Sequence, residues 1–482
     1  MIPPRASLAL GLAALVVVGG VAAAVRTPGP ASAEAFLTDA EGRALVPSGF
    51  NTASSSKQVA SGLPDFTEDD LDTEYADMGT NFVRYLISWR KIEPEPGVYD
   101  QGYLDDVEER IGWYADRGYH VMLDMHQDLW GNAITPSGMN GNGAPAWATY
   151  MDGLPVAESL PMWELYYLEP GVIRAFDNFW NTTGAHPELM DHYAGAWRAV
   201  AARFADNEAV VAYDLMNEPY GGTVQGPAFE AGPLTALYQK SVDAIREVDD
   251  DTWACLEPQA LGFNWGLPSG LGFVDDPRDG AARIAFCPHI YPLPMDLGDG
   301  FAGVSRDLVE GTVAAWRSNA LRTAQALGGV PVILGEFGLN TELPGAIDYV
   351  ELMYETSDAS GFGVVYWSRD PGSWGPYDAE GEPRNLVEAV SRPYPRAVAG
   401  DLRSWEVGPD VLTIRLGAAG GGDIDGGRSG GGAAVSEAYL PADGFPDGAE
   451  ITGGEIVAWD AATGVIGFTI DSGATEIVIR AR

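Results

Sequence analysis

Val210-Val211-Ala212-Tyr213-Asp214-Leu215-Met216-Asn217-Glu218-Pro219 is an apolar run that ends in a carboxylic acid. A second run of this kind, Pro331-Val332-Ile333-Leu334-Gly335-Glu336-Phe337-Gly338, carries its acid at the corresponding point. Short continuous apolar runs are typical of parallel strands that are buried on both faces. In α/β barrels the functional side chains lie at the carboxyl ends of such strands, so Glu218 and Glu336 are the first candidates for a site.

Strand-like runs alternate with helix-length segments on both sides of these two stretches. They occupy residues 44–50, 81–86, 120–126, 210–217, 252–257, 283–291, 331–337 and 364–368. Eight strand–helix units predict an α/β fold of the (β/α)8 type, the TIM barrel. The alternative is an open doubly wound sheet, which usually has fewer strands and a glycine-rich nucleotide loop after its first strand. Here that place is taken by Asn51-Thr52-Ala53-Ser54-Ser55-Ser56-Lys57, which contains no glycine.

The pattern changes after Pro395. Short β-branched runs, separated by glycine, aspartate and proline, occupy residues 410–416, 455–459, 464–470 and 475–479. This spacing predicts a C-terminal antiparallel β-sandwich domain. We therefore expect the barrel domain at residues 34–395 and the sandwich at 396–482, with the glycine-rich residues 417–434 as a loop inside the sandwich.

Composition limits the classes of partner. The chain has 482 residues, 46% of them hydrophobic, which is enough for a large core. It carries 28 basic and 69 acidic residues, for a formal net charge of -41. Such a surface repels nucleic acid and anionic lipid headgroups, so we expect no nucleic-acid partner. Most of the acidity is interpreted as a solvated surface.

The N-terminus has the pattern of an export signal. Arg5 precedes an apolar stretch at residues 6–25, and Ala31-Ser32-Ala33 follows. Small residues at positions 31 and 33 fit a signal-peptidase site, which predicts a signal peptide at 1–33 and a secreted, extracellular protein. The alternative is an uncleaved N-terminal anchor, because the apolar stretch is just long enough to span a bilayer.

The chain has two cysteines, Cys255 and Cys287, and each lies inside an expected strand. In an exported protein they can form a disulfide. On neighbouring parallel strands, however, the geometry for a disulfide is often unfavourable, and buried free thiols are the alternative. Neither alternative gives the cysteines a catalytic role.

One connection is far longer than a turn. Residues 127–188 follow the third expected strand and are rich in aromatic residues: Trp130, Trp147, Trp163, Tyr166, Tyr167, Phe176, Phe179 and Trp180. Long insertions in compact domains are usually functional or disordered, and so many aromatic residues argue against disorder. We expect a wall or lid of a binding cleft, with a small satellite core over the barrel rim as the alternative.

Polar residues at the strand ends suggest a reaction. Two carboxylic acids on different strands are what the hydrolysis of a glycosidic bond needs, because one donates a proton and the other attacks the anomeric carbon. A nearby arginine favours the charged form of the attacking group. An asparagine beside the acid can bind the sugar 2-hydroxyl, a tyrosine can donate to the nucleophile, and a tryptophan offers a flat face to the sugar ring.

These residues resemble the pattern of glycoside hydrolase family 5. That family belongs to a clan of barrels that places its acid/base on strand four and its nucleophile on strand seven. All eight positions expected from the resemblance are present in order: Arg84, His126, Asn217, Glu218, His289, Tyr291, Glu336 and Trp367. The resemblance covers residues 40 to 395 and implies that Glu218 is the acid/base and Glu336 the nucleophile.

Within the family, the details are similar to those of endoglycoceramidases, which release an intact oligosaccharide from ceramide. The segments that carry this similarity are Gly49-Phe50-Asn51 with the serine-rich run to Lys57, Asp124-Met125-His126-Gln127-Asp128, Gly143-Ala144-Pro145-Ala146-Trp147 and Leu215-Met216-Asn217-Glu218-Pro219-Tyr220-Gly221-Gly222. A sandwich after the barrel also matches. The similarity implies that Lys57 and Asp128 bind hydroxyls of the first sugar.

The expected activity is therefore retaining hydrolysis of glycosphingolipids, with Glu336 attacking and Glu218 protonating the departing ceramide alcohol. It needs no cofactor, and the sequence shows no metal-ligand spacing. We expect a monomer that makes transient contact with a membrane or micelle surface. The alternatives are an endo-galactosylceramidase, a family 5 β-glucanase, β-mannanase or β-glucosidase acting on soluble glycans, and a non-enzymatic carbohydrate-binding protein on an inactive barrel.

Overall fold

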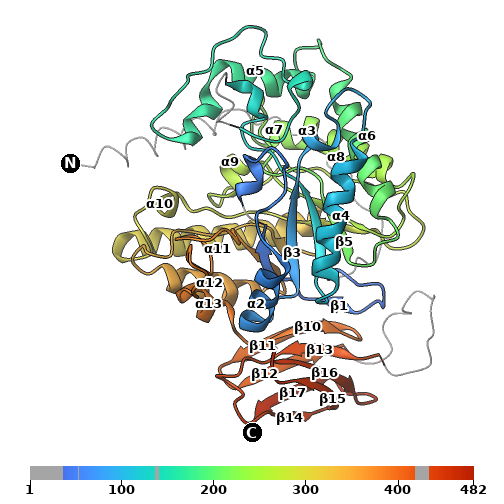
Figure 1. Cartoon of the computed structure of the whole chain (residues 1–482), viewed down its shortest axis with the longest axis vertical. Coiled ribbons are helices and arrows are strands. Elements are labelled where there is room, and N and C mark those ends of the chain that lie inside the picture. The colour runs from blue at the N-terminus through green and yellow to red at the C-terminus, as the bar shows by residue number, and fades with distance from the viewer. Residues whose placement is uncertain (1–35, 53, 136–140, 418–433) are drawn as a thin grey trace.

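The computed structural model describes residues 36–52, 54–135, 141–417 and 434–482. The expected signal peptide and nearly all of the expected glycine-rich loop lie outside these residues. Within them, the larger part of the chain is a barrel of parallel strands, and the C-terminal part is a separate antiparallel domain that packs against one end of the barrel (Figure 1). The predicted fold class is confirmed.

Eight parallel strands of the described chain form the barrel wall, in the order β7-β6-β5-β4-β3-β2-β9-β8. The strands are β2 (Ser48–Asn51), β3 (Phe82–Ile87), β4 (His120–Met125), β5 (Val210–Asp214), β6 (Trp253–Leu256), β7 (Ile284–Phe286), β8 (Ile333–Leu334) and β9 (Gly363–Tyr366). Parallel bridges Phe286↔Val332 and His289↔Glu336 join β7 to β8. These two bridges close the barrel, and the second of them joins residues that follow β7 and β8.

Helices cover the outside of the barrel because each carries an apolar face at helical spacing. In α6 the buried positions include Tyr193, Trp197, Val200 and Phe204. The helices are α2 (Glu68–Met78), α3 (Trp89–Ile92), α4 (Gln101–Ala115), α5 (Pro170–Phe179), α6 (Leu189–Phe204), α7 (Pro227–Phe229), α8 (Thr235–Ile245), α9 (Ala260–Phe263), α10 (Leu293–Asp296), α11 (Gly303–Ala326), α12 (Ala346–Asp358) and α13 (Asn385–Val390). Shorter helical turns are η1 (Ser54–Lys57), η2 (Asn132–Ile134), η3 (Ala146–Ala148), η4 (Trp163–Leu168) and η5 (Glu230–Leu234).

The first expected strand is in fact two strands. The early part, β1 (Ala44–Leu45), pairs antiparallel with β10 (Tyr394–Val398) and belongs to the sandwich, whereas β2 belongs to the barrel. Pro47 interrupts the run between them. The domain border expected at residue 395 falls inside β10. Because β1 pairs with β10, the N-terminal segment and the sandwich share a sheet.

The sandwich has two antiparallel sheets in its described residues, ordered β1-β10-β13-β16-β15 and β11-β12-β17-β14. The additional strands are β11 (Leu402–Gly408), β12 (Val411–Leu416), β13 (Ser436–Tyr439), β14 (Ala449–Thr452), β15 (Gly454–Asp460), β16 (Val465–Ile470) and β17 (Glu476–Ala481). Their inner faces enclose a separate apolar core that includes Trp405, Ile414, Phe468 and Ile479.

Polar contacts join the sandwich to the base of the barrel. The carbonyl oxygen of Gly79, at the end of α2, accepts a hydrogen bond from the Tyr394 hydroxyl at 2.7 Å and another from Arg396. In addition, Arg43 of the N-terminal segment bonds Asp39 and, on β13, Glu437 at 2.7 Å each, which fastens this segment to the sandwich. The sandwich therefore lies at the end of the barrel away from the carboxyl ends of the strands.

Cys255 on β6 and Cys287, directly after the neighbouring strand β7, are buried free thiols, which decides between the two alternatives in this structure. Among the described residues, no helix has both the length and the apolar character needed to cross a bilayer.

Candidate active site

Glu218 and Glu336 meet at the carboxyl end of the barrel. Glu218 follows β5 and Glu336 follows β8, and both side chains turn toward His289 after β7. One carboxylate oxygen of each glutamate and one ring nitrogen of His289 lie within 4.8 Å of one another. Carboxyl groups about 5–5.5 Å apart are typical of retaining glycosidases, whereas inverting enzymes need roughly 6.5 Å or more to admit a water. The geometry is that of a retaining pair.

Two donors bind the carboxylate of Glu336. Arg84 Nη1 lies 2.6 Å from Oε1, and the Tyr291 hydroxyl donates to Oε2 at 3.0 Å. Both residues come from other strands, Arg84 from β3 and Tyr291 from the segment after β7. The ion pair and the two hydrogen bonds fix the orientation of this carboxylate.

Arg84 is fully buried and contacts more than the nucleophile. Its guanidinium bonds Asp124 and Glu257 at 2.9 Å, and Asp214 at 2.7 Å. The amide oxygens of Asn51 and Asn217 accept from it at 2.9 Å each. One guanidinium thus neutralises part of a buried group of four carboxyls.

The carboxyls around Arg84 cannot all be ionised at low cost, because burial penalises each charge. Burial raises the pKa of Asp214 to about 6, in spite of the opposing charge of Arg84. Burial and the charge of Asp214 raise the pKa of Glu257 well above its usual range. Burial therefore favours the protonated form of both Asp214 and Glu257.

Glu218 is held by different partners. Asn264 Nδ2 donates to its Oε1 at 2.8 Å, and His289 Nδ1 lies 3.2 Å from the same oxygen. Burial and the negative charge of Asp128 raise the pKa of Glu218. Burial lowers the pKa of His289 to about 3, so this ring is neutral near pH 7. A glutamate that keeps its proton is the form needed by a general acid.

Lys57, His126, Asp128 and Trp367 form a second polar group beside the glutamates. Lys57 Nζ lies 2.9 Å from Asp128 Oδ2 and 4.1 Å from the centre of the Trp367 ring. The rings of His126 and Trp367 are stacked, with centroids 5.5 Å apart at an interplanar angle of 13°. Burial would raise the pKa of Asp128, but Lys57 and His126 hold it well below its usual range. Trp367 is only partly buried, so part of its side chain remains accessible.

The structure brings together all ten residues selected from the sequence. Asn217 was expected to bind a sugar hydroxyl, but its amide is buried and makes hydrogen bonds within the protein. Its Oδ1 accepts from Arg84 at 2.9 Å, and its Nδ2 donates to the carbonyl of Gln127 at 3.0 Å. Sequence reasoning did not select Asn51, Asp124, Asp214, Glu257 or Asn264, all of which contact the site. The signal for Asp214 and Glu257 was present, since each is an acid inside or ending an apolar strand.

Two groups of side chains lie close enough to ligate a metal ion, which the sequence did not lead us to expect: Asp214, Glu257 and His289, and Glu218, His289 and Glu336. In the first group Arg84 already bonds both carboxyls. The second group includes the two glutamates themselves. Retaining hydrolysis uses protons and a covalent sugar intermediate, so its chemistry does not call for an ion at either place.

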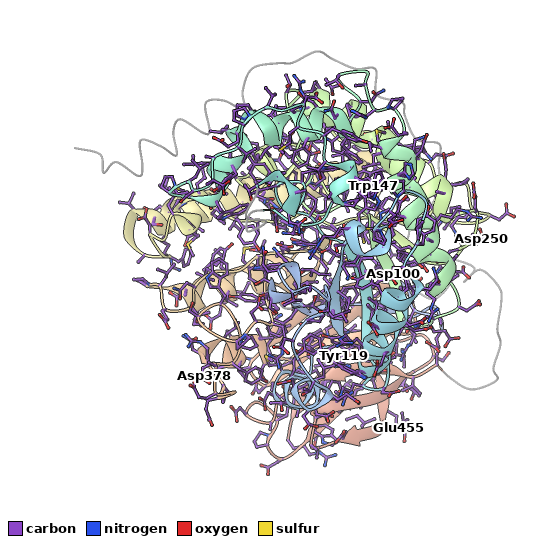
Figure 2. All side chains as sticks on the ribbon, turned by 45° about the horizontal axis from the view of Figure 1, so that its top comes forward. Asp100, Tyr119, Trp147, Asp250, Asp378 and Glu455 are labelled. Carbon is purple, nitrogen blue, oxygen red and sulfur yellow. The ribbon has the colours of Figure 1, made fainter. Side chains whose placement is uncertain are left out.

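The aromatic side chains of the insertion pack mainly into the hydrophobic core of the barrel domain. Trp89, Trp130, Trp147, Phe179 and Tyr193 form a network of ring contacts, with centroid distances from 4.5 to 6.0 Å. Figure 2 shows Trp147 in the upper part of the molecule, away from Glu455 in the sandwich. Trp163, on η4, is 48% exposed and is not enclosed by this core. Most of the insertion thus extends the barrel core and does not form a separate satellite core, and η4 contributes exposed apolar surface.

A closed (β/α)8 barrel with two glutamates so placed defines a retaining glycoside hydrolase. Residues 38–373 match the model of the cellulase family, glycosyl hydrolase family 5. The chain therefore belongs to glycoside hydrolase family 5, and the predicted family is confirmed.

Individual relatives give a finer comparison. The chain is 30% identical over 383 residues to endoglycoceramidase I of Rhodococcus hoagii, covering 76% of this chain and 72% of that protein. It is 58% identical to endo-glycoceramidase II from Rhodococcus sp., whose complex with ganglioside GM3 superposes with a TM-score of 0.87 over 93% of this chain and 100% of that chain. A lactosyl-enzyme intermediate of that protein superposes with a TM-score of 0.86 over 93% of this chain and 99% of that chain. The prediction of a retaining enzyme is confirmed, which argues against an inactive barrel.

Proposed function

We propose that this chain is an endoglycoceramidase, which hydrolyses the bond between an intact oligosaccharide and ceramide in glycosphingolipids. The observation that carries the proposal is the pairing of Glu218 and Glu336 within 4.8 Å, in a chain 58% identical to endo-glycoceramidase II. The GM3 complex of that relative favours oligosaccharides of the ganglioside type over 6-linked galactosyl chains.

The mechanism follows from the partners of each glutamate. Glu336, held by Arg84 and Tyr291, attacks the anomeric carbon of the sugar next to ceramide. Glu218 protonates the departing oxygen of the primary alcohol, so that the carbon–oxygen bond breaks without forming a free alkoxide. Glu218 then takes a proton from water, which attacks the glycosyl ester and releases the sugar with net retention and an ionised Glu336.

The sugar next to the scissile bond would bind against Trp367. Lys57 and Asp128 form an ion pair that directs donors and acceptors toward this face, and His126 supports the ring from behind. Aromatic rings bind the apolar faces of sugars, while charged groups pair with hydroxyls.

The lipid would enter from the apolar rim. Trp163 and Leu168 on η4, and Val304 and Leu308 on α11, are exposed, and Val304 is 77% exposed. Both elements follow carboxyl ends of barrel strands, so they lie at the same end as the glutamates. Isolated exposed apolar residues are common, but a group at the mouth of a site suits transient contact with a micelle or membrane. We propose that a monomer makes this contact.

The N-terminal pattern supports export, with cleavage after Ala33. Mass spectrometry of protein recovered from the culture medium of an expressing bacterium should give a mature start near Glu34. Full-length protein that still carries residues 1–33 and is recovered in the membrane fraction would indicate the uncleaved anchor instead.

Parallel digestion tests the activity. The protein is incubated with a ganglioside bearing a fluorescent ceramide, with a 6-linked galactosyl ceramide and with carboxymethyl cellulose. We expect intact oligosaccharide and free ceramide from the ganglioside, and no turnover by Glu336→Gln, which should fold normally by circular dichroism. Cleavage of cellulose alone would overturn the lipid substrate, and preference for the galactosyl ceramide would assign the other subclass. Full activity of Glu336→Gln would refute the proposed nucleophile.

A further inference from the structure

The main chain of Glu218 has an unusual conformation. Its φ is 42°, in the left-handed region that a glutamate rarely adopts. Residues in this conformation are strained and persist where surrounding contacts hold them. The carboxyl of Glu218 has to meet the departing oxygen, so whatever holds this backbone also aims the proton.

Side chains from two other strands hold the peptide groups on both sides of Glu218. Gln127, after β4, donates through Nε2 to the carbonyl oxygens of Asn217 at 2.8 Å and of Glu218 at 3.0 Å. Glu257, after β6, accepts the backbone N–H of Glu218 through Oε2 at 2.9 Å. The left-handed residue is thus fixed at its N–H and at its C=O by groups that do not touch its carboxyl.

Gln127 is itself braced. Its Oε1 accepts the backbone N–H of Trp130 at 3.0 Å, and its own carbonyl accepts from Asn217 at 3.0 Å. Gly143 lies against it so closely that a Cβ at this position would fall 2.4 Å from Gln127 Cβ. A side chain with both amide atoms used and no room to move is a rigid support.

Glu257 connects the two halves of the reaction. While Oε2 accepts from Glu218, Oε1 bonds Arg84 at 2.9 Å, and Arg84 in turn bonds Glu336 at 2.6 Å. The backbone of Glu257 is fixed by the Tyr238 hydroxyl, which donates to its carbonyl at 2.8 Å.

We infer that Gln127 and Glu257 are positioning residues that clamp the left-handed peptide of Glu218 and thereby aim the acid/base, with Glu257 also tying it to the arginine of the nucleophile. This inference rests on the proposed function, since it concerns the role of Glu218 in that reaction. It predicts that loss of the Gln127 amide reproduces, in weaker form, the kinetic signature of a defective acid/base.

That signature depends on the leaving group. Ceramide alkoxide is a poor leaving group and needs the proton, whereas 2,4-dinitrophenolate leaves without it. Azide, which needs no general base, attacks the glycosyl ester of an acid/base mutant, forms a glycosyl azide with retained configuration and frees the carboxylate. Loss of general folding or of sugar binding would instead affect both leaving groups alike and would give no azide effect.

Gln127→Met, which keeps the size and removes the amide, is compared with the parent on fluorescent lactosylceramide and on 2,4-dinitrophenyl β-lactoside. A displaced catalytic group costs roughly 10- to 100-fold, so kcat on lactosylceramide should fall by that factor. We expect kcat/KM on the dinitrophenyl lactoside to stay within about 3-fold of the parent. Azide should raise its turnover and yield lactosyl azide. Equal losses on both substrates without glycosyl azide would overturn the clamp.

Gln259→Met is the matched control. Gln259 is also buried and also bonds only main-chain groups with its amide, those of Gly226 and Leu261, neither of which is part of the site. Both substrates should be turned over as by the parent. Glu257→Gln keeps one oxygen for two donors, so we expect losses on both substrates together with an azide effect. Loss on the dinitrophenyl lactoside with no azide product in Glu257→Gln would remove Glu257 from the clamp.

Gln127→Glu covers the case in which the methionine variant does not fold, because it keeps the acceptor for Trp130 and loses the amide donors. It should show the same dependence on the leaving group and the same azide product, and their absence would overturn the inference. Failure of the proposed function is distinguishable, because then the parent protein itself would not cleave lactosylceramide, whatever its activity on the soluble dinitrophenyl lactoside.

Discussion

The proton of Glu218 is subject to opposing influences from single residues. Burial and Asp128 raise its pKa, while the hydrogen bond from Asn264 lowers it. The first step needs Glu218 protonated, so kcat/KM should fall as the pH rises through this pKa. Asn264→Ala removes a donor to the ionised form, and we expect the alkaline limb of the kcat/KM profile on lactosylceramide to move to higher pH.

Asp128→Asn is the control, because it should shift the pKa of Glu218 in the opposite direction. Removing its negative charge takes away a cause that raises the pKa of Glu218 and leaves Lys57 without its partner. The alkaline limb should then move to lower pH, with a weaker sugar affinity as well. Shifts of both variants in the same direction would mean that another group sets this limb.

Residue by residue, the sequence predicted the groups that face the substrate better than those behind them. Glu218, His289, Tyr291 and Glu336 could be found because each follows an apolar run. Asp214 and Glu257 carry the same signal, but their role could not be assigned, since it depends on Arg84 reaching across the barrel from β3. Asn264 lies after α9, away from any strand end, and no local pattern indicates that it contacts Glu218.

At the scale of elements, the junction between α2 and the sandwich depends on one glycine. Gly79 ends α2 with φ 58°, and a Cβ there would lie 2.0 Å from the ring of Tyr439 on β13. Left-handed conformation costs an alanine about 1–2 kcal/mol and overpacking about 1–3 kcal/mol. Gly79→Ala should therefore lower the free energy of unfolding by about 2–5 kcal/mol, measured by urea denaturation followed by intrinsic fluorescence.

Gly97→Ala separates the two contributions. Gly97 has φ 75°, but no atom lies within 4 Å of the position of its Cβ. Only the backbone cost of about 1–2 kcal/mol should appear there. An effect of Gly79→Ala no larger than that of Gly97→Ala would mean that the Tyr439 contact adjusts freely.

The sequence predicted strands well where both faces of the strand are buried, and less well elsewhere. Each of the eight barrel strands coincided with an expected run to within one residue at the carboxyl end of β2 and β3 and at the start of β9, because parallel strands buried on both faces are continuous apolar segments. β11 was not predicted, since only Leu402 and Trp405 are buried among its polar residues. β1 was expected in the barrel sheet but pairs with β10 of the sandwich. Its residue Ala44 lies opposite Val398, some 350 residues further along the chain, and the local sequence does not indicate so distant a pairing.

At the scale of the whole molecule, the apolar rim and the acidic surface act in opposite ways on a lipid substrate. The lipid contact that we propose uses the exposed apolar residues of η4 and of the start of α11. The net charge of -41 opposes approach to any anionic surface, and exposed acids such as Asp250 and Glu455 project outward from the molecule (Figure 2). Access to substrate should therefore depend on the charge of the surface that carries it, beyond the fit of a single lipid in the cleft.

This balance predicts a dependence on ionic strength. The interaction between exposed charges is screened beyond a distance of about 10 Å at 0.1 M salt and beyond about 30 Å at 0.01 M salt. At low salt, hydrolysis of lactosylceramide should be faster in neutral phosphatidylcholine vesicles than in vesicles that also contain phosphatidylserine, by roughly 10-fold. Added sodium chloride should narrow the difference by accelerating the reaction on the anionic vesicles. Hydrolysis of soluble 2,4-dinitrophenyl β-lactoside should not respond to salt in this range. Equal rates on both vesicles at low salt would show that the acidic surface lies away from the membrane during turnover, and only the rim would then decide how the enzyme meets its substrate.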